Sequence, residues 1–324
     1  SARSEAERSF GKPGLYVEKL VRPARHIEFQ VISDGRGKTI HLGERECSIQ
    51  RRHQKLLELT PSPALDEVSR KRVGELAVRV AKSLDYENVG TVEFLRDEEG
   101  KFYFIEVNAR LQVEHPITES VTGLDLVQQQ LLIASGEGMP LSQKRVVRSG
   151  ASMQCRINAE DATSGFAPST GTIHGLRLPS GPGVRVDTAV YHGYRIPEFY
   201  DSLIAKVITW GQNLEESRLR MMAALEEFTI DGVRTTTEFQ KQVISHNHFR
   251  EWKLDIDFVE KNWIVESLAE KLAQERQRAV LESAAIAASI IVQGIHKSVS
   301  LESGPSTRSA TWAASGGPRF YDAV

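Results

Sequence analysis

The sequence predicts an α+β protein. Two observations predict this class. Apolar and polar residues alternate, as they do in strands, over residues 15–46 and 90–108. Apolar residues recur at helical spacing over residues 65–84 and 124–134. We therefore expect a sheet with helices packed against it.

Turn residues mark the ends of these elements. The run Asp-Gly-Arg-Gly at residues 34–37 predicts a turn between two strands. Pro61 and Pro63 precede the first helix, and Gly136 follows the second. The run Asp-Glu-Glu-Gly at residues 97–100 predicts the loop of a β-hairpin.

The second half of the chain has a different pattern. Periodicity lapses at residues 138–148, and we place a domain boundary there. Residues 151–210 are rich in Gly, Pro and β-formers, which predicts mainly strands and turns. Asn213 is a good N-cap for a helix that ends near Phe228, and residues 235–244 predict a further helix.

These patterns predict two domains, residues 1–140 and residues 148–262, and a tail over residues 264–324. In the tail, residues 264–295 predict an amphipathic or partly buried helix. Ser, Gly, Thr and Ala dominate residues 298–318, which predicts a flexible segment.

Composition narrows the function classes. With 41 basic and 43 acidic residues, the net charge of -2 argues against a general nucleic-acid binder. The longest apolar run, near residues 284–292, is far shorter than the ~20 residues of a membrane span. Cys47 and Cys155 form neither a metal-ligand spacing nor a disulfide framework, which favours the cytoplasm or an organelle matrix.

Two carboxylates fall close together on the predicted hairpin. If residues 97–100 form a four-residue loop, Glu93 lies opposite Phe104. Phe104 and Glu106 share a face, so Glu93 and Glu106 become diagonal neighbours, and Asn108 continues that face.

Large apolar residues on both faces of this hairpin suggest a sheet that is covered on both sides. Two carboxylates under such a cover repel each other unless a cation joins them. Oxygen ligands of this kind suit Mg²⁺ or Mn²⁺ bound together with nucleotide phosphates. The alternative is a solvated polar face, and we favour the metal site.

The following residues carry polar side chains at every even position. An extended chain aims Arg110, Gln112 and Glu114 at the same face as the carboxylates. A guanidinium and an amide suit a planar oxyanion, and a nearby carboxylate can act as a general base. A salt-bridged surface strand explains the spacing equally well.

Further candidate residues are basic. Residues 50–55, Gln-Arg-Arg-His-Gln-Lys, suit phosphate or carboxylate oxygens, although an isolated charge run is more simply a solvated loop. His26 and His53, taken singly, are most simply structural. Arg156 lies near two acidic residues, and a structural ion pair is its simplest explanation.

Together these residues resemble the biotin carboxylase family, the ATP-grasp component of biotin-dependent carboxylases that act on acyl-CoAs, pyruvate or urea. The resembling stretches are residues 44–55, 104–118 and 155–161, and similarity is continuous over residues 1–262. The resemblance implies the second half of an ATP-grasp domain followed by a biotin carboxylase C-terminal domain.

The resemblance also implies roles for individual residues. The metal positions are Glu93, Glu106 and Asn108. The nucleotide-binding positions are Glu18, Lys19, Val21, His26, Gln50, His53 and Leu95. The substrate-binding positions are Lys55, Arg110, Gln112, Val113 and Arg156. The catalytic positions are Glu114, which deprotonates bicarbonate, together with Arg110, Lys55 and Arg156, which stabilises the enolate-like oxygen of biotin.

The implied activity is carboxylation of carrier-bound biotin through carboxyphosphate, with ATP and Mg²⁺ or Mn²⁺. The implied partners are a biotin carboxyl carrier protein or domain, a carboxyltransferase and a second copy of the chain, with Arg185 near the dimer surface. Acetyl-CoA carboxylase and fatty acid biosynthesis are one such setting. No nucleic acid or membrane is implied.

Family members also carry an N-terminal domain, a lysine pair and a Gly-rich loop over the phosphates, and these would precede Ser1. The chain starts without Met, as a fragment or a processed product would. We therefore expect little carboxylation of free biotin by this chain alone. The alternative is a non-catalytic interaction or dimerisation module. An ATP-grasp ligase of the carbamoyl-phosphate type is disfavoured by residues 50–55 with Arg156.

Overall fold

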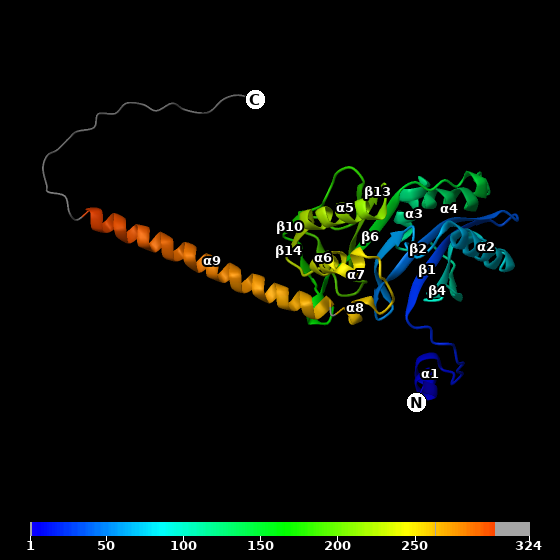
Figure 1. Cartoon of the computed structure of the whole chain (residues 1–324), viewed down its shortest axis with the longest axis horizontal. Helices are drawn as coiled ribbons and strands as arrows, with labels where there is room; N and C mark the ends of the chain where they lie inside the picture. The colour runs from blue at the N-terminus through cyan, green and yellow to red at the C-terminus, as the bar shows by residue number, and fades with distance from the viewer. Residues whose placement is uncertain (1, 263, 302–324) are drawn as a thin grey trace, which may run out of the picture. The chain divides into compact units, whose positions relative to one another are not determined.

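The computed structural model describes residues 2–262 and 264–301. The chain divides into two compact units, Ser1–Ala269 and Glu270–Val324. The first unit holds an eight-stranded sheet in the order β11-β13-β6-β3-β2-β1-β4-β5, in which every neighbouring pair of strands is antiparallel. Strands β1, β2, β4, β6 and β13 of this sheet are labelled in Figure 1. With its helices, this sheet confirms the predicted α+β class.

The strands of the large sheet are β1 (Ala24–Asp34), β2 (Thr39–Arg51), β3 (Gln54–Thr60), β4 (Glu87–Asp97), β5 (Phe102–Asn108), β6 (Ala151–Asn158), β11 (Val184–Thr188) and β13 (Leu203–Gly211). The short strands are β7 (Glu160–Asp161), β8 (Ala167–Pro168), β9 (Gly171–Thr172), β10 (Gly175–Arg177), β12 (Arg195–Ile196) and β14 (Thr229–Asp231).

The helices are α1 (Ala2–Phe10), α2 (Glu67–Ser83), α3 (His115–Thr122), α4 (Leu126–Ala134), α5 (Leu214–Glu227), α6 (Thr237–Ser245), α7 (Asn247–Arg250), α8 (Phe258–Lys261) and α9 (Ile264–Leu301), with short 3₁₀ turns η1 (Gln143–Arg145) and η2 (Ala162–Ser164). None of the helices in the described ranges is long and apolar enough to cross a membrane.

The helices α2, α4, α5 and α6 confirm the four helices predicted for the first 262 residues. Asp66 caps α2 by accepting a hydrogen bond from the Ser69 backbone, and Asn213 caps α5 in the same way from Glu216. The helices α1 and α3 were not predicted. The first strand was predicted too early, because residues 11–23 form neither a helix nor a strand.

The sheet runs without a break across the predicted domain boundary, because β3 pairs with β6. The boundary itself stays a prediction. In the tail, α9 confirms the predicted helix, and the first two turns of α9 are partly buried through Ile264 and Leu268. Most of the segment predicted to be flexible lies outside the described residues.

Side-chain alternation along β1 positions the site. The odd-numbered residues Ile27, Phe29 and Val31 pack in an apolar core beneath α2, with Val73 and Ala77 of that helix. The even-numbered residues therefore point to the opposite face of the sheet. They are His26, Glu28 and Gln30.

The register of the β4–β5 hairpin differs from the prediction in two respects. The Asp97 N–H donates to the Lys101 carbonyl, so the loop has three residues and Gly100 takes a φ of +81°. A bulge then adds one residue to β5 between the pairs Phe94–Phe104 and Glu93–Glu106. Glu93 and Glu106 are consequently direct partners across the strands and not diagonal neighbours.

The expectation that this hairpin is covered on both sides is also wrong. β5 is the edge strand of the sheet, and the side chains of Phe104 and Ile105 are 55% and 41% exposed. Glu93 alone of the carboxylate pair is buried, at 3% exposure. The prediction failed because apolar residues on both faces of a strand do not show whether other elements of the protein pack over those faces.

Candidate active site

A fully buried arginine organises the polar face of the sheet. Arg45 donates from Nε to Glu28 (2.5 Å), from Nη1 to Gln30 (2.6 Å) and from Nη2 to Gln112 (2.9 Å). The remaining two donors reach Thr118 (3.0 Å) and Thr91 (3.2 Å), so all five N–H groups of the guanidinium have acceptors.

Burial acts to lower the pKa of Arg45, but the neighbouring Glu28 and Glu114 carboxylates outweigh it and raise that pKa. Burial likewise acts to raise the pKa of Glu28, whereas Arg45 and Lys55 hold it below its usual value. Both groups therefore stay charged in the interior, where each stabilises the other.

Lys55 joins three carboxylates. Its Nζ lies 2.5 Å from Glu28, 3.0 Å from Glu93 and 2.8 Å from Glu114. An ammonium has three donors, and all three are used here. Burial opposes the charge, yet the carboxylates, with Glu28 foremost, raise the pKa of Lys55 above its ordinary value.

Arg156 lies between two buried acids from other parts of the chain. Its Nε donates to Glu58 (2.6 Å) and its Nη2 donates to Glu114 (3.0 Å). The ion pairs are therefore long-range, and neither acid next to Arg156 in the sequence takes part. Burial and the nearby Glu114 raise the pKa of Glu58 despite Arg156.

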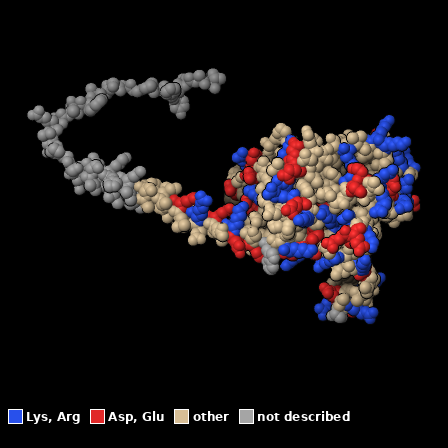
Figure 2. Space-filling model, viewed as in Figure 1, with Lys and Arg blue, Asp and Glu red and all other residues tan. Residues whose placement is uncertain are grey.

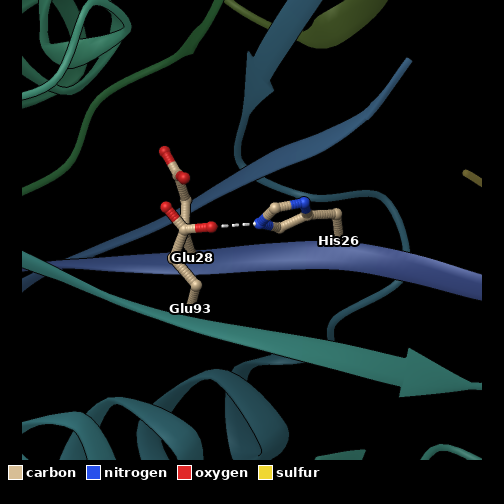
Figure 3. Close-up of side chains that lie close together, drawn as sticks. All are labelled: His26, Glu28 and Glu93. Atoms are coloured by element: carbon tan, nitrogen blue, oxygen red, sulfur yellow. Dashed lines mark hydrogen bonds and ion pairs between the residues drawn. The ribbon is translucent and has the colours of Figure 1, made fainter. Parts of the chain in front are cut away.

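Glu93 is the centre of the predicted metal site. Its Oε2 lies 2.6 Å from His26 Nε2, as Figure 3 shows beside Glu28. Asn108 donates from Nδ2 to Glu93 (2.8 Å) and to Glu106 (2.9 Å). Burial acts to raise the pKa of Glu93, but His26 and Lys55 hold it well below its usual range.

The three predicted metal positions thus meet at one point. Two carboxylates from paired strands share a single amide donor, which is where a hard cation with oxygen ligands would fit. A second group could also hold an ion, because ligand atoms of His26, Glu28 and Glu93 lie within 4.8 Å of one another. The donor set is compatible with a divalent cation.

These groups open onto a cavity of about 580 Å³. Of the predicted site residues, all but Glu18 line it: Lys19, Val21, His26, Gln50, His53, Lys55, Glu93, Leu95, Glu106, Asn108, Arg110, Gln112, Val113, Glu114 and Arg156. Lys19 donates to the Tyr103 hydroxyl at 3.0 Å. Glu18 is exposed and lies outside the lining.

Arg110 differs from Lys55 and Arg156, the partly buried cations of the cavity. Its guanidinium is exposed and donates one hydrogen bond, to the Leu111 carbonyl at 3.2 Å. Within the described ranges it has no ion-pair partner. The predicted extended run is also incomplete, because the chain turns at Val113 and Glu114 and enters α3 at His115.

The basic cluster at residues 50–55 forms the β2–β3 turn. Gln50 pairs with Lys55 and Arg51 with Gln54, so the loop has two residues. Those residues, Arg52 and His53, have φ values of 50° and 65°. A two-residue hairpin with both φ values positive matches the twist of the strands, and it sets Lys55 facing into the cavity.

Sequence reasoning missed Glu28, Arg45 and Glu58. Glu28 had a usable signal, since polar and apolar residues alternate in the run His26–Gln30. The sequence around Arg45, Glu-Arg-Glu, looks like a surface charge run, and Glu58 is one acid among apolar neighbours. Their partners come from distant segments, so no local pattern could have found them.

Two family models match the chain. Residues 1–143 match the family model "Carbamoyl-phosphate synthase L chain, ATP binding domain", and residues 154–261 match "Biotin carboxylase C-terminal domain". The second model decides the matter, because it separates this family from other ATP-grasp proteins. The chain belongs to the biotin carboxylase family.

Biotin carboxylase of Nostoc sp. is 49% identical over 261 residues, which cover 81% of this chain and 58% of the relative. Biotin carboxylase 1 of Bacillus subtilis is 50% identical and is covered to the same 58%. The chain thus spans rather more than half the length of these relatives.

Solved structures give the same result. The biotin carboxylase domain dimer of Hydrogenobacter thermophilus 2-oxoglutarate carboxylase, in complex with MgADP, ADP and bicarbonate, matches with a TM-score of 0.78 and 47% identity. The match covers 81% of this chain and 58% of that chain. The biotin carboxylase C-terminal and ATP-grasp domains predicted from sequence are thereby confirmed as the fold.

Proposed function

We propose that this chain forms the bicarbonate- and metal-binding part of a biotin carboxylase. That enzyme carboxylates biotin on a carrier protein, with ATP and bicarbonate, through carboxyphosphate. The observation that carries the proposal is that Arg110 has no ion-pair partner among the described residues and lies in a cavity that Lys55, Glu114 and Arg156 also line. An anion that enters the cavity meets the exposed Arg110 guanidinium and a carboxylate able to take its proton.

Bicarbonate would be held by Arg110, Lys55 and the Gln112 amide, with Val113 at the wall. Glu114 would accept the proton of the bicarbonate hydroxyl. The resulting oxyanion attacks the γ-phosphorus of ATP, the bond to the β-phosphate oxygen breaks, and ADP leaves. Lys55 and Arg110 would lie where negative charge develops, so they would stabilise the transition state without having to reorganise.

Carboxyphosphate then breaks its C–O bond to give CO₂ and phosphate. The phosphate would take the proton from the ureido nitrogen of biotin, and that nitrogen attacks CO₂ to form carboxybiotin. Arg156 would stabilise the enolate-like oxygen of the ureido group. Its hydrogen bonds to Glu58 and Glu114 support this role, because they fix the guanidinium at the edge of the cavity.

Glu93, Glu106 and Asn108 would hold Mg²⁺ or Mn²⁺, which neutralises the phosphate charge when bound. Lys19, Val21, His26, Gln50, His53 and Leu95 would surround the nucleotide, since they line the same cavity. Glu18 would join them from the segment before β1.

The proposed partners are a biotin carboxyl carrier protein or domain, a carboxyltransferase and a second copy of the chain. Arg185 would lie near the dimer surface, and it pairs with Glu119 (2.7 Å) and Asp187 (2.7 Å). Free thiols at Cys47 and Cys155 support a cytoplasmic or organelle-matrix location. A merely non-catalytic module is not favoured, because every predicted site residue except Glu18 lines one cavity.

The proposal is tested by Glu114→Gln in the complete carboxylase. The amide cannot take the bicarbonate proton, so bicarbonate-dependent ATP hydrolysis should fall by at least about 100-fold. Nucleotide binding should persist, because Glu114 contacts Lys55 and Arg156 and not the metal group.

The matched control is Glu46→Gln, which alters a buried carboxylate that does not line the cavity. Its hydrolysis rate should stay within a few-fold of the wild-type rate. Unchanged hydrolysis in Glu114→Gln would rule out the proposed base.

A further inference from the structure

A second cavity, of about 690 Å³, lies along α2, β2 and the residues from η1 to Arg148. It shares no lining residue with the candidate active site. Its volume is in the range of small-molecule sites, roughly 300–1,000 Å³. Six cations line it: Arg70, Lys71, Arg72, Arg79, Lys144 and Arg148.

Most of this positive charge is not neutralised by the protein. Arg70 and Arg148 pair with the acids Glu44 and Glu67. The other four cations are exposed and have no ion-pair partner in the described part of the chain. They are Lys71, Arg72 and Arg79 on α2 and Lys144 on η1. The acidic residues of the lining are Glu67 and Glu75, against six cations, so the lining carries a net positive charge.

His41 adds a neutral donor to this lining. Burial and the nearby Arg148 lower its pKa to about 4, so the ring is uncharged at pH 7. The Gly43 N–H donates to His41 Nδ1 at 3.3 Å, which leaves the ring proton on Nε2. Nε2 has no hydrogen-bond partner within the described ranges.

The cavity is held in a fixed shape. The His41 ring lies against Gly74 of α2 so closely that a Cβ there would come within 2.4 Å of it. Gln143 of η1 exchanges two hydrogen bonds with the His41 backbone, each 2.9 Å long. The cations of the lining other than Arg148 therefore lie on helix α2 and on turn η1, both of which are packed against β2 through His41.

We propose that this second cavity binds a small polyanion that carries two or more phosphate groups. Lys71 and Arg79 are eight positions apart on one helix, which is about 12 Å along its axis. A single phosphate group is too small to contact both Lys71 and Arg79, whereas a chain of phosphates is long enough. Lys144 of η1 lines the same cavity, so charged donors from two elements would bind the anion.

The test uses the full chain labelled at its histidine rings and inorganic tripolyphosphate as the probe. The NMR signal of His41, assigned with His41→Asn, should shift saturably. The signals of His26 and His53 report separately on phosphate in the candidate active site. Arg79→Gln and Lys144→Gln should each weaken the His41 response by about tenfold, because each removes a charged hydrogen-bond donor.

Lys82→Gln is the matched control, since Lys82 is an exposed cation of α2 that does not line the cavity. It should leave the His41 titration unchanged. Inorganic monophosphate should bind at least about tenfold more weakly than tripolyphosphate, because it accepts fewer charged hydrogen bonds. The proposal is overturned if His41 does not shift, or if the two lining variants titrate like the control.

Discussion

At the scale of single residues, the site depends on buried charges, each of which would be unfavourable without its oppositely charged partners. Arg45 is fully buried and is neutralised chiefly by Glu28, while Lys55 bridges Glu28, Glu93 and Glu114. Removing one member leaves its partner charged and unpaired in a poorly solvated place. The same network fixes the cavity side chains, so stability and geometry are coupled there.

Arg45→Met should therefore lower the free energy of unfolding by about 3–5 kcal/mol, because Glu28 loses its main cation and the other acceptors of Arg45 lose their donor. Urea denaturation measures the change. Arg145→Met is the control, since Arg145 is exposed and has no ion pair within the described residues. A difference between the two variants of less than about 1 kcal/mol would contradict the described network.

At the scale of elements, the β4–β5 hairpin determines where the carboxylates meet. The bulge in β5 sets Glu106 directly across from Glu93, and the edge position leaves Glu106 open to a ligand. Changing Glu106 should therefore affect a bound cation and leave the fold largely unaffected.

Glu106→Gln should weaken Mg²⁺-dependent nucleotide binding by at least about tenfold, since even outer partners of a metal typically contribute roughly 10- to 100-fold. The measurement is a calorimetric titration of MgADP into the complete carboxylase. Glu99→Gln, in the exposed loop of the same hairpin, serves as the comparison. Equal MgADP affinities in the two variants would count against a cation shared by Glu93 and Glu106.

The elements that could be predicted from the sequence are those with a local cause. Helices α2 and α5 have apolar periodicity and side-chain caps, and both lie where expected. The register of β4–β5 could not be predicted, because a single bulged residue shifts it without altering the alternation that precedes it. The cavity residues were found mainly by resemblance, since their partners lie far away in the chain.

At the scale of the whole first unit, one sheet carries residues from both matched domains to one cavity. β6 supplies Arg156 beside β3, which supplies Lys55 and Glu58, and the two strands are paired. The site residues therefore become neighbours through folding of the complete sheet. Figure 2 shows acidic and basic side chains interspersed on the face in view, in keeping with the small net charge.

Folding of this unit also couples to pH through His41. Its pKa falls from 6.5 to about 4 on folding, so the unfolded chain binds more protons between these values. The free energy of unfolding therefore rises with pH between about 4 and 6.5. The stabilisation that comes from neutral His41 is fully present above about pH 6.5 and is lost as the pH falls toward 4.

Urea unfolding at pH 7 and pH 5 should show a larger loss of stability for the wild-type chain than for His41→Gln, which cannot titrate at this position. The difference should be modest, because the ring is in part solvated. Equal losses in the two proteins would show that His41 is not held neutral by burial.

Arg110 has no ion-pair partner among the described residues and lines the same cavity as Lys55 and Glu114, and we propose that it binds bicarbonate there. The most direct test of this central proposal is a titration of ¹³C-bicarbonate into the complete carboxylase and its Arg110→Met variant, followed by NMR, with Arg96→Met as the control. We predict saturable binding that Arg110→Met weakens by about tenfold or more and that Arg96→Met leaves unchanged. Equal bicarbonate affinity in all three proteins would contradict the account.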